Sequence, residues 1–248
     1  MQLIELRDYI GRLLEVDRFR DYCPNGIQVE GRAEIHRIAS GVTASQHLLE
    51  AATEWGADAI LVHHGYFWRN EDATLTGIKK RRIAHLLQRD VSLLAYHLPL
   101  DAHAELGNNA QLGRMLGLQA QGRFGEQDIA WHGELQQPQT LAEFAATITH
   151  QLQRAPQIIG EGGRTLRRVA WCTGAAQGYF EQAVALGVDA FLTGEISEQN
   201  VHVARETGVA FIAAGHHATE RYGVQALGGH LAQQFSLEHR FFDQDNPV

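Results

Sequence analysis

This chain contains two pairs of adjacent histidines, and histidine is a residue type that commonly binds metals. His63 and His64 end the apolar run 59–62 and precede Gly65, and His216 and His217 follow a glycine. The chain has 14 histidines in 248 residues, more than twice a usual share of about 2%. Imidazole nitrogens are common ligands of zinc, iron and related divalent ions. The pairs therefore indicate a metal site.

Carboxylates accompany the histidines. Glu220 lies four residues after His216, so on a helix both side chains face one side. Asp101 follows His97 after a Leu-Pro-Leu step. Each residue also has a simpler explanation, because Glu220 suits the start of a helix dipole and Asp101 could cap a helix. Taken together, three imidazoles and two carboxylates could hold two metals, one carboxylate bridging them. The predicted ligands are His63, His64, Asp101, His216 and Glu220.

Other polar residues are weaker candidates. His97, His103 and His217 could each donate a hydrogen bond behind the ligands, carry a proton, or be ordinary surface residues. Glu195 occupies the place in the second half of the chain that His64 occupies in the first. It could contact substrate or act as a base, and the alternative is a turn residue after a glycine. Glu195 and His97 are the predicted catalytic residues.

The elements that position these residues form a repeat. The first half predicts a strand at 37–42, a helix at 45–55 and a strand at 57–62, and the second predicts a strand at 168–172, a helix at 177–186 and a strand at 188–192. Residues 55–61 and 186–192 match almost residue for residue. A third strand and helix follow in each half. The turn at 173–176 could also hold a phosphate on backbone amides, although glycines at such turns are more often structural.

Strands that alternate with helices predict an α/β fold with mostly parallel sheets. Ligands in such sheets bind at the carboxyl ends of the strands, where the candidate residues lie. We expect duplicated halves at 1–118 and 167–248, with the metal site between them. Residues 119–166 break the pattern and predict a connecting segment, with a strand at 129–135 and a helix capped by Thr140 and Glu143.

The composition favours a soluble, acidic protein. The formal net charge is −8, which disfavours non-specific nucleic-acid binding. Only two cysteines occur, Cys23 and Cys172, and we expect both to be reduced in the cytoplasm. No signal peptide or membrane span is expected, because the N-terminus lacks a basic region before an apolar one and no apolar run reaches about 18 residues.

The chain resembles the Nif-three-like family, whose members are often labelled homologues of a type 2 GTP cyclohydrolase I. The resemblance rests on the order of several motifs over essentially the whole chain: 22–31, Val62-His63-His64-Gly65, His97 to Asp101 with 107–109, 193–195 and 215–220. The chain differs from the family pattern at Cys23, where small residues are usual. The resemblance implies a dinuclear metal centre with the five ligands named above and a toroidal homohexamer built from dimers.

Three functions follow as hypotheses. The first is a hydrolase with two divalent metals (Fe, Mn or Zn) that acts on a nucleotide or modified base, as the cyclohydrolase label implies. Glu220 would bridge, Asp101 and His64 would complete one metal, and His63 and His216 the other. The second is a non-catalytic metal-bearing ring that binds a protein partner. The third, a ring that threads DNA, is the weakest because the chain is acidic.

Overall fold

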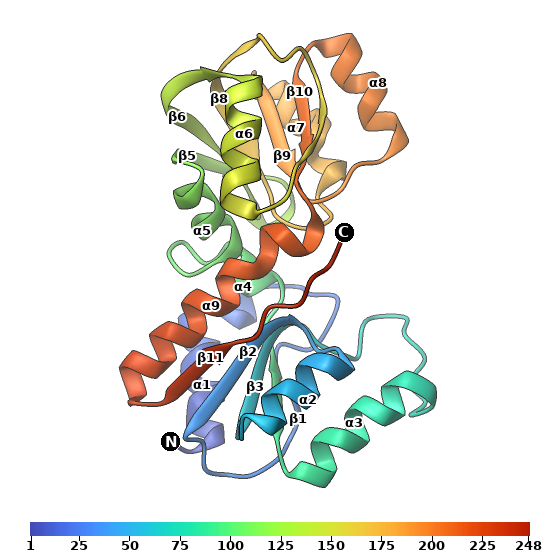
Figure 1. The fold of residues 1–248 in the computed structure, drawn as a ribbon, viewed down its shortest axis with the longest axis vertical. Coiled ribbons are helices and arrows are strands. Elements are labelled where there is room, and N and C mark those ends of the chain that lie inside the picture. The colour runs from blue at the N-terminus through green and yellow to red at the C-terminus, as the bar shows by residue number, and fades with distance from the viewer. The chain divides into compact units, whose positions relative to one another are not determined.

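A computed structural model describes residues 1–248, which divide into two compact units. Unit 1 comprises Met1–Gly107 and Gly223–Asp245, and unit 2 comprises Asn108–Tyr222 and Asn246–Val248. Each unit has its own sheet (Figure 1). These bounds differ from the expected division at 1–118, 119–166 and 167–248. The middle segment belongs wholly to unit 2, and most of the last long helix belongs to unit 1.

The sheet of unit 1 has five strands in the order β1-β4-β3-β2-β11. Strands β4, β3, β2 and β11 are parallel, and β1 pairs with β4 in the antiparallel sense. Their bounds are Gly26–Val29 (β1), Arg37–Thr43 (β2), Ala59–His64 (β3), Ser92–Ala95 (β4) and Glu238–Phe241 (β11).

Helices cover both faces of this sheet. Alternate residues of β3 enter different cores: Leu61 packs in one with α1 and α9, and Ile60 in the other with α2 and α3. A strand buried on both faces has to be apolar throughout, which explains the run 59–62. The helices are α1 (Leu3–Leu13), α2 (Gln46–Glu54), α3 (Gly77–Arg89), α4 (Leu98–Ala102) and the part of α9 (His216–Phe235) from Gly223 onward; η1 (Val16–Arg18) is a short 3₁₀ turn.

The sheet of unit 2 is mixed and has the order β5-β6-β8-β9-β10-β7. Its central strands β8, β9 and β10 are parallel, and the other three pairings are antiparallel. The strands are β5 (Leu118–Phe124), β6 (Ala130–Thr140), β7 (Gln157–Ile159), β8 (Thr165–Trp171), β9 (Ala190–Thr193) and β10 (Ala210–Ala213). The expectation of mostly parallel sheets thus describes unit 1 but only the centre of unit 2.

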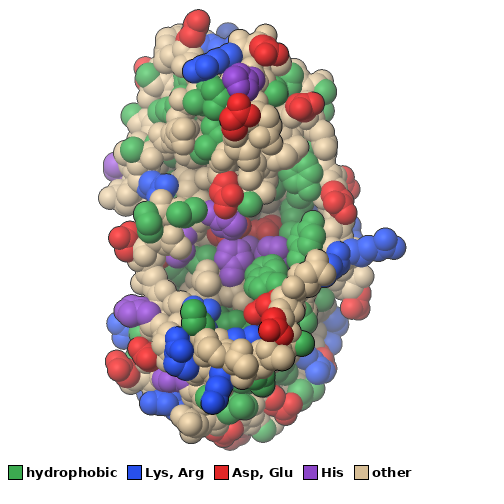
Figure 2. All heavy atoms as spheres, turned by 90° about the vertical axis from the view of Figure 1, so that its right-hand side faces the viewer, with side chains coloured by type: hydrophobic (Ala, Val, Ile, Leu, Met, Phe, Trp, Pro, Cys, Tyr) green, Lys and Arg blue, Asp and Glu red, His purple; other side chains and the backbone are tan.

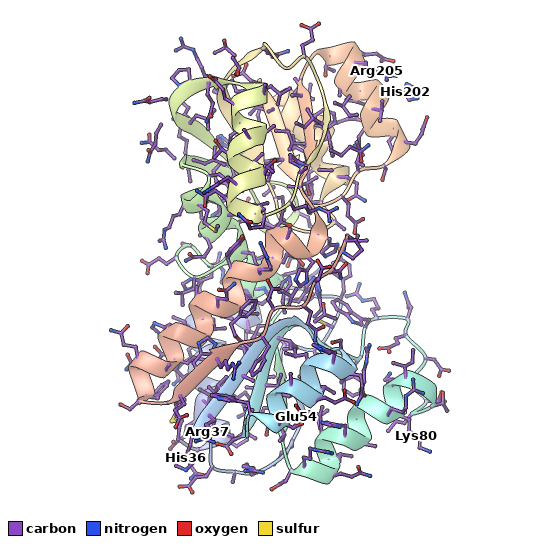
Figure 3. All side chains as sticks on the ribbon, in the orientation of Figure 1. His36, Arg37, Glu54, Lys80, His202 and Arg205 are labelled. Atoms are coloured by element: carbon purple, nitrogen blue, oxygen red, sulfur yellow. The ribbon has the colours of Figure 1, made fainter.

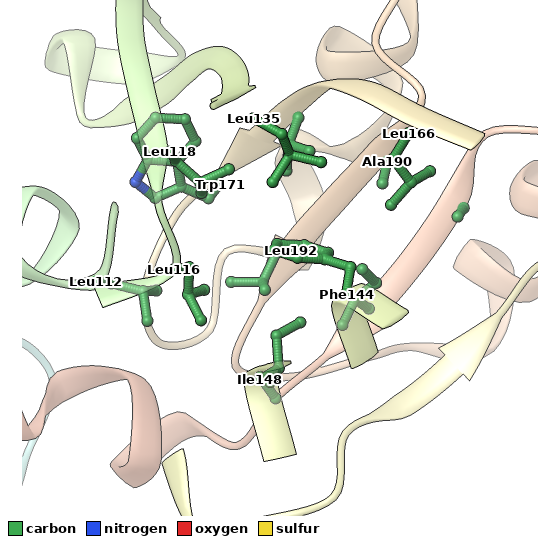
Figure 4. Close-up of a cluster of buried hydrophobic side chains, with 14 of the residues drawn as sticks. Leu112, Leu116, Leu118, Leu135, Phe144, Ile148, Leu166, Trp171, Ala190 and Leu192 are labelled. Carbon is green, nitrogen blue, oxygen red and sulfur yellow. The ribbon is translucent and has the colours of Figure 1, made fainter. Parts of the chain in front are cut away.

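The helices of unit 2 pack onto this sheet, and some of them share an apolar core that includes Phe144, Ile148, Trp171 and Leu192 (Figure 4). They are α5 (Asn108–Met115), α6 (Leu141–Leu152), α7 (Phe180–Ala185), α8 (Glu198–Thr207) and the first turns of α9, with 3₁₀ turns η2 (Glu126–Asp128) and η3 (Gln177–Tyr179). Helix α6 begins in the predicted capping box, because the side chain of Thr140 accepts from the Glu143 amide while the Glu143 carboxylate accepts from the Thr140 amide.

The α/β class and the internal repeat are both present. The β2-α2-β3-α3-β4 segment of unit 1 corresponds to β8-α7-β9-α8-β10 of unit 2. Asp58 and Asp189 hold equivalent places before β3 and β9. Each aspartate accepts from two successive backbone amides, at 2.8 and 2.9 Å, at the start of β2 or within β8.

The surface has no segregation of charge on the face drawn in Figure 2, where acidic and basic side chains are interspersed. No helix combines the length and the apolar composition needed to cross a bilayer.

Candidate metal centre

His63 and His64 are the last two residues of β3, at its carboxyl end. Successive residues of a regular strand point to opposite faces, yet these two rings lie close, with centroids 4.6 Å apart. Nδ1 of His63 is 2.9 Å from the carbonyl oxygen of Tyr96. Because a carbonyl only accepts, Nδ1 carries the proton and Nε2 keeps its lone pair for a metal. His64 places its Nδ1 3.2 Å from the hydroxyl of Thr43.

Asp101 completes a nitrogen and oxygen pair with His63. It lies in the short helix α4, is 6% exposed, and places Oδ1 3.4 Å from Nε2 of His63. An imidazole nitrogen beside a buried carboxylate is a pair of ligand atoms that zinc, iron and manganese accept.

His97 joins the two strand-end histidines. The ligand atoms of His63, His64 and His97 all lie within 4.8 Å of one another. Asp21 holds the third imidazole from behind, with Oδ1 2.7 Å from its Nδ1. The backbone amide of His97 donates to Oδ1 of Asn25 at 2.8 Å. A carboxylate behind a histidine fixes its tautomer and orientation, as is usual around metal sites.

Both carboxylate oxygens of Asp21 accept hydrogen bonds. Its two oxygens accept from the Tyr22 amide, the Asn25 side chain and the Leu98 amide in addition to His97. Burial raises its pKa, but these hydrogen bonds and the facing imidazole outweigh burial and hold the pKa below the ordinary value. Asp21 also lies within 4.8 Å of Cys23 and His97. Its saturated oxygens favour a positioning role there over a metal ligand.

Unit 2 carries a second line of ligand-type residues at the start of α9. Nε2 of His216 lies 3.1 Å from Oε2 of Glu220, one helical turn later, as the spacing predicts. Nδ1 of His216 lies 2.7 Å from Oε1 of Glu195, which follows β9. Glu195 therefore stands behind His216 as Asp21 stands behind His97.

The two carboxylates control the charge of His216. Burial lowers its pKa, but the hydrogen bonds and charges of Glu220 and Glu195 outweigh burial and raise the pKa to about 9. Without a metal the imidazole is thus protonated at neutral pH. A metal that binds at Nε2 has to displace that proton.

Gly174 makes room for these ligands. It lies after β8 with φ +68°, and a Cβ at this position would lie 2.1 Å from Oε1 of Glu220 and 3.2 Å from Nε2 of His216. Only glycine combines that backbone conformation with such a close approach. The turn at 173–176 is therefore shaped around the ligands.

The same turn offers little to a phosphate. The amide of Thr173 donates to Asn109, that of Gly174 to Thr219, and that of Ala176 to Thr193. Amides that already donate inside the protein are not available to an anion. The phosphate site considered for this turn is therefore not supported.

The structure thus gathers the candidate residues into two sets, one in each unit. Unit 1 brings together His63, His64, His97 and Asp101, and unit 2 brings together Glu195, His216 and Glu220. The two weaker candidates lie outside the sets. Nδ1 of His103 accepts from the amides of Glu105 and Leu106, which stabilises the turn after α4. His217 belongs to no ligand-type group, and its backbone amide donates to the carbonyl of Val248.

Comparison with known proteins identifies the family. The model of the family described as Duf34/NIF3 (NGG1p interacting factor 3) matches residues 1–247. This chain belongs to the DUF34/NIF3 family. The expected resemblance is thereby confirmed over the whole length.

Close DUF34/NIF3 relatives carry a cyclohydrolase name. A Pseudomonas aeruginosa protein named GTP cyclohydrolase 1 type 2 homolog is 56% identical over 240 residues, which cover 96% of this chain and 95% of the relative. An Allochromatium vinosum protein of the same name is 55% identical, with 99% and 98% covered. Among solved structures, protein ybgI, described as of unknown function, has a TM-score of 0.96 at 46% identity with both chains fully covered. A Thermus thermophilus protein has a TM-score of 0.90 at 31% identity, also with full coverage.

Sequence reasoning missed the residues that hold the ligands of this family member in place. Asp21 and Asn25 were not among the predicted site residues, yet both bind His97, more than 70 residues further along the chain. The carbonyl of Tyr96 has no sequence signal at all. Asp21 had only a weak signal, because an aspartate in a turn often accepts hydrogen bonds from nearby backbone amides.

Proposed function

We propose that this DUF34/NIF3 protein is a hydrolase that uses two divalent metal ions and acts on a nucleotide or purine-type ring. The proposed ligands are His63, His64 and Asp101 of unit 1 with His216 and Glu220 of unit 2. One observation carries the proposal. In each unit an imidazole whose Nδ1 faces an oxygen places its Nε2 beside a buried carboxylate: His63 beside Asp101 and His216 beside Glu220.

The donor set fits divalent iron, manganese or zinc. It combines imidazole nitrogens with carboxylate oxygens and contains no thiolate, a mixture that all three metals accept. Two such ions, when bound, activate water near neutral pH and polarise the bond to be cleaved. The five ligands leave room for water and substrate.

The remaining groups of the site would orient ligands and move protons. Glu195 fixes Nδ1 of His216 at 2.7 Å, and Asp21 fixes Nδ1 of His97 at the same distance. Because Nδ1 of His97 is engaged by Asp21, its Nε2 is the nitrogen that remains for proton transfer. We propose His97 as the group that transfers a proton to or from the substrate, and Glu195 as a base that can assist from the other unit.

A turnover assay tests this proposal. Purified protein would be incubated with GTP and other nucleotides in the presence of Fe²⁺, Mn²⁺ or Zn²⁺, and the products separated by chromatography. We expect hydrolysis by the wild type and a loss of at least about a hundredfold in His64→Ala. The matched control is His202→Ala, because His202 is exposed on α8 (Figure 3). Equal turnover by wild type and His64→Ala, both folded, would contradict the proposal.

A second candidate is a non-catalytic metal-binding ring that binds a protein, and the family description favours it by naming an NGG1p interacting factor. Stoichiometric metal without turnover of any nucleotide would select this candidate. For both candidates we propose a cytoplasmic homohexamer built from dimers. Analytical ultracentrifugation tests the assembly, and a monomer at micromolar concentration would contradict it.

A further inference from the structure

Two aromatic side chains of unit 1 lie beside the histidines rather than in a core. Trp68 and Tyr22 belong to none of the three apolar cores of the protein. Tyr22 is 50% exposed, and Trp68 is half-buried. Large aromatic rings are usually buried in the core because their burial stabilises the fold. Rings that remain at the surface next to ligand-type residues therefore suggest a role other than core packing.

The imidazole of His97 contacts both of these rings. The Trp68 ring meets the imidazole of His97 edge-on, with centroids 5.0 Å apart and planes at 85°. The Tyr22 ring meets it from 6.3 Å at 64°. Trp68 also lies 6.0 Å from the ring of His64. Both aromatic rings therefore border the imidazoles that carry the proposed chemistry.

The backbone holds the two rings in place. Phe67, the residue before Trp68, has φ +65°, a left-handed conformation that is unfavourable for a non-glycine residue and is typical of functional segments. Arg69, the residue after Trp68, donates its backbone amide to the carbonyl of Tyr22 at 2.6 Å and its guanidinium to the carbonyl of Asp21 at 2.9 Å. The segment that carries Trp68 is thus tied directly to the segment that carries Tyr22.

The polar edge of the indole is already satisfied, since Nε1 of Trp68 donates to the carbonyl of Gly65 at 3.2 Å. What Trp68 offers a ligand is therefore its ring face. A ring face recognises other planar rings by stacking, and alanine substitution of such a side chain weakens the binding of a stacked base about 10–100-fold. An isolated phosphate would gain nothing from it, and a sugar ring, which is not planar, would gain less than a purine.

We propose that Trp68, with Tyr22 at its side, is the platform on which the planar purine ring of the substrate stacks beside His64 and His97. The inference rests on the proposed function, because it names the part of the substrate that the site recognises. It assigns substrate selection to these aromatic residues and leaves metal binding to the histidines and carboxylates.

Binding of guanosine tests the platform without requiring turnover or phosphate contacts to the metal. Isothermal titration calorimetry would compare guanosine with ribose, using the purified full-length protein with the metal it carries. We expect measurable binding of guanosine but not of ribose, a loss of about 10–100-fold in Trp68→Ala, and near-normal binding in Trp68→Phe, which keeps a ring. The matched control is Phe124→Ala, because Phe124 is half-buried and lies beside His132 in unit 2, with ring centroids 6.3 Å apart.

Three results would overturn the platform: no guanosine binding by the wild type, equal affinity in Trp68→Ala, or ribose binding as strong as guanosine binding. Circular dichroism on each variant shows whether it is folded. If Trp68→Ala is not, Trp68→Leu decides the case, because it keeps an apolar side chain but has no ring face and should lose affinity where Trp68→Phe does not. The two proposals fail separately. If guanosine binding depends on Trp68 but no nucleotide is turned over, the platform stands and the hydrolase proposal fails. If a nucleotide is turned over but Trp68→Ala binds guanosine as the wild type does, the hydrolase proposal stands and the platform fails.

Discussion

The carboxylate of Asp21 lies 2.7 Å from Nδ1 of His97, whose imidazole forms a group with those of His63 and His64. In unit 2, Glu195 stands at the same distance from Nδ1 of His216. These carboxylates orient the imidazoles and make Nε2 of each ring a stronger electron-pair donor to a metal. They also explain why residues far from the histidine motifs matter to the site.

Replacing Asp21 by asparagine should weaken the site without dismantling it. Asp21→Asn removes the negative charge behind His97 and lets the imidazole change tautomer, so we expect turnover to fall about 10–100-fold. Turnover of the proposed nucleotide substrate, measured across pH, checks this. Asp17→Asn, at an exposed position, is the control and should behave as the wild type. An Asp21→Asn variant with the rate and pH profile of the wild type would refute the positioning role.

Gly174 should tolerate no side chain. In Gly174→Ala the new Cβ would lie 2.1 Å from Oε1 of Glu220, and the residue would keep a positive φ. We expect about 1–3 kcal/mol less stability from the backbone strain alone and loss of metal as Glu220 is displaced. Chemical denaturation and metal analysis measure the two effects. Gly178→Ala is the matched control, because a Cβ there meets nothing within 4 Å. Equal metal content in both variants would show that Gly174 does not shape the site.

The aspartate that immediately precedes β3 should matter for stability. Asp58 accepts from the amides of His36 and Arg37 and from the guanidinium of Arg32. Asp58→Ala leaves these donors without their acceptor, so we expect a loss of about 1.5–3 kcal/mol in the free energy of unfolding. Glu54→Ala, on the exposed side of α2 (Figure 3), should change it by less than about 0.5 kcal/mol. Denaturant titration compares the two, and equal stability would count against the assigned role of Asp58.

Acid should weaken unit 1 through His239. This residue of β11 contacts the hydroxyl of Ser40 at 2.8 Å, and burial holds its pKa below the ordinary value of 6.5. The unfolded chain therefore takes up the proton more readily than the folded one. The stability that depends on the neutral imidazole is full above about pH 6.5 and is lost as the pH falls below that value toward the folded-state pKa.

Thermal melts at pH 7.5 and pH 5.5 check this dependence. His239→Gln keeps a hydrogen-bonding group near Ser40 but does not titrate, so its melting temperature should fall less between the two pH values than that of the wild type. The acid sensitivity would have another origin if both proteins lost the same number of degrees.

The sequence was sufficient to predict the elements that carry the ligands. The apolar run 59–62 predicts a buried strand, and it is one because both faces of β3 enter a core. The i,i+4 spacing of His216 and Glu220 predicts one helical face, and their side chains do meet on α9. Local periodicity governs these features, so they can be predicted from the sequence.

Features that depend on distant pairing were not legible. β6 runs through Gln136-Gln137-Pro138-Gln139, residues with little preference for strands, because Gln139 and Thr140 pair with β8 after a shift in register. β11 forms because Glu238 and its neighbours pair with β2, about 200 residues earlier in the chain. The contact between Asp21 and His97 also joins residues that are distant in the sequence, and no local pattern in either segment indicates its partner.

The proposed dinuclear metal centre can be tested directly by measuring the metal content per subunit. Elemental mass spectrometry would be applied to the wild type, to His64→Ala and to the exposed-site control His202→Ala, each purified in the same way. We expect about two divalent ions per subunit in the wild type and the control, falling to one or none in His64→Ala. No stoichiometric metal in the wild type, or the same content in His64→Ala, would contradict the proposed dinuclear centre.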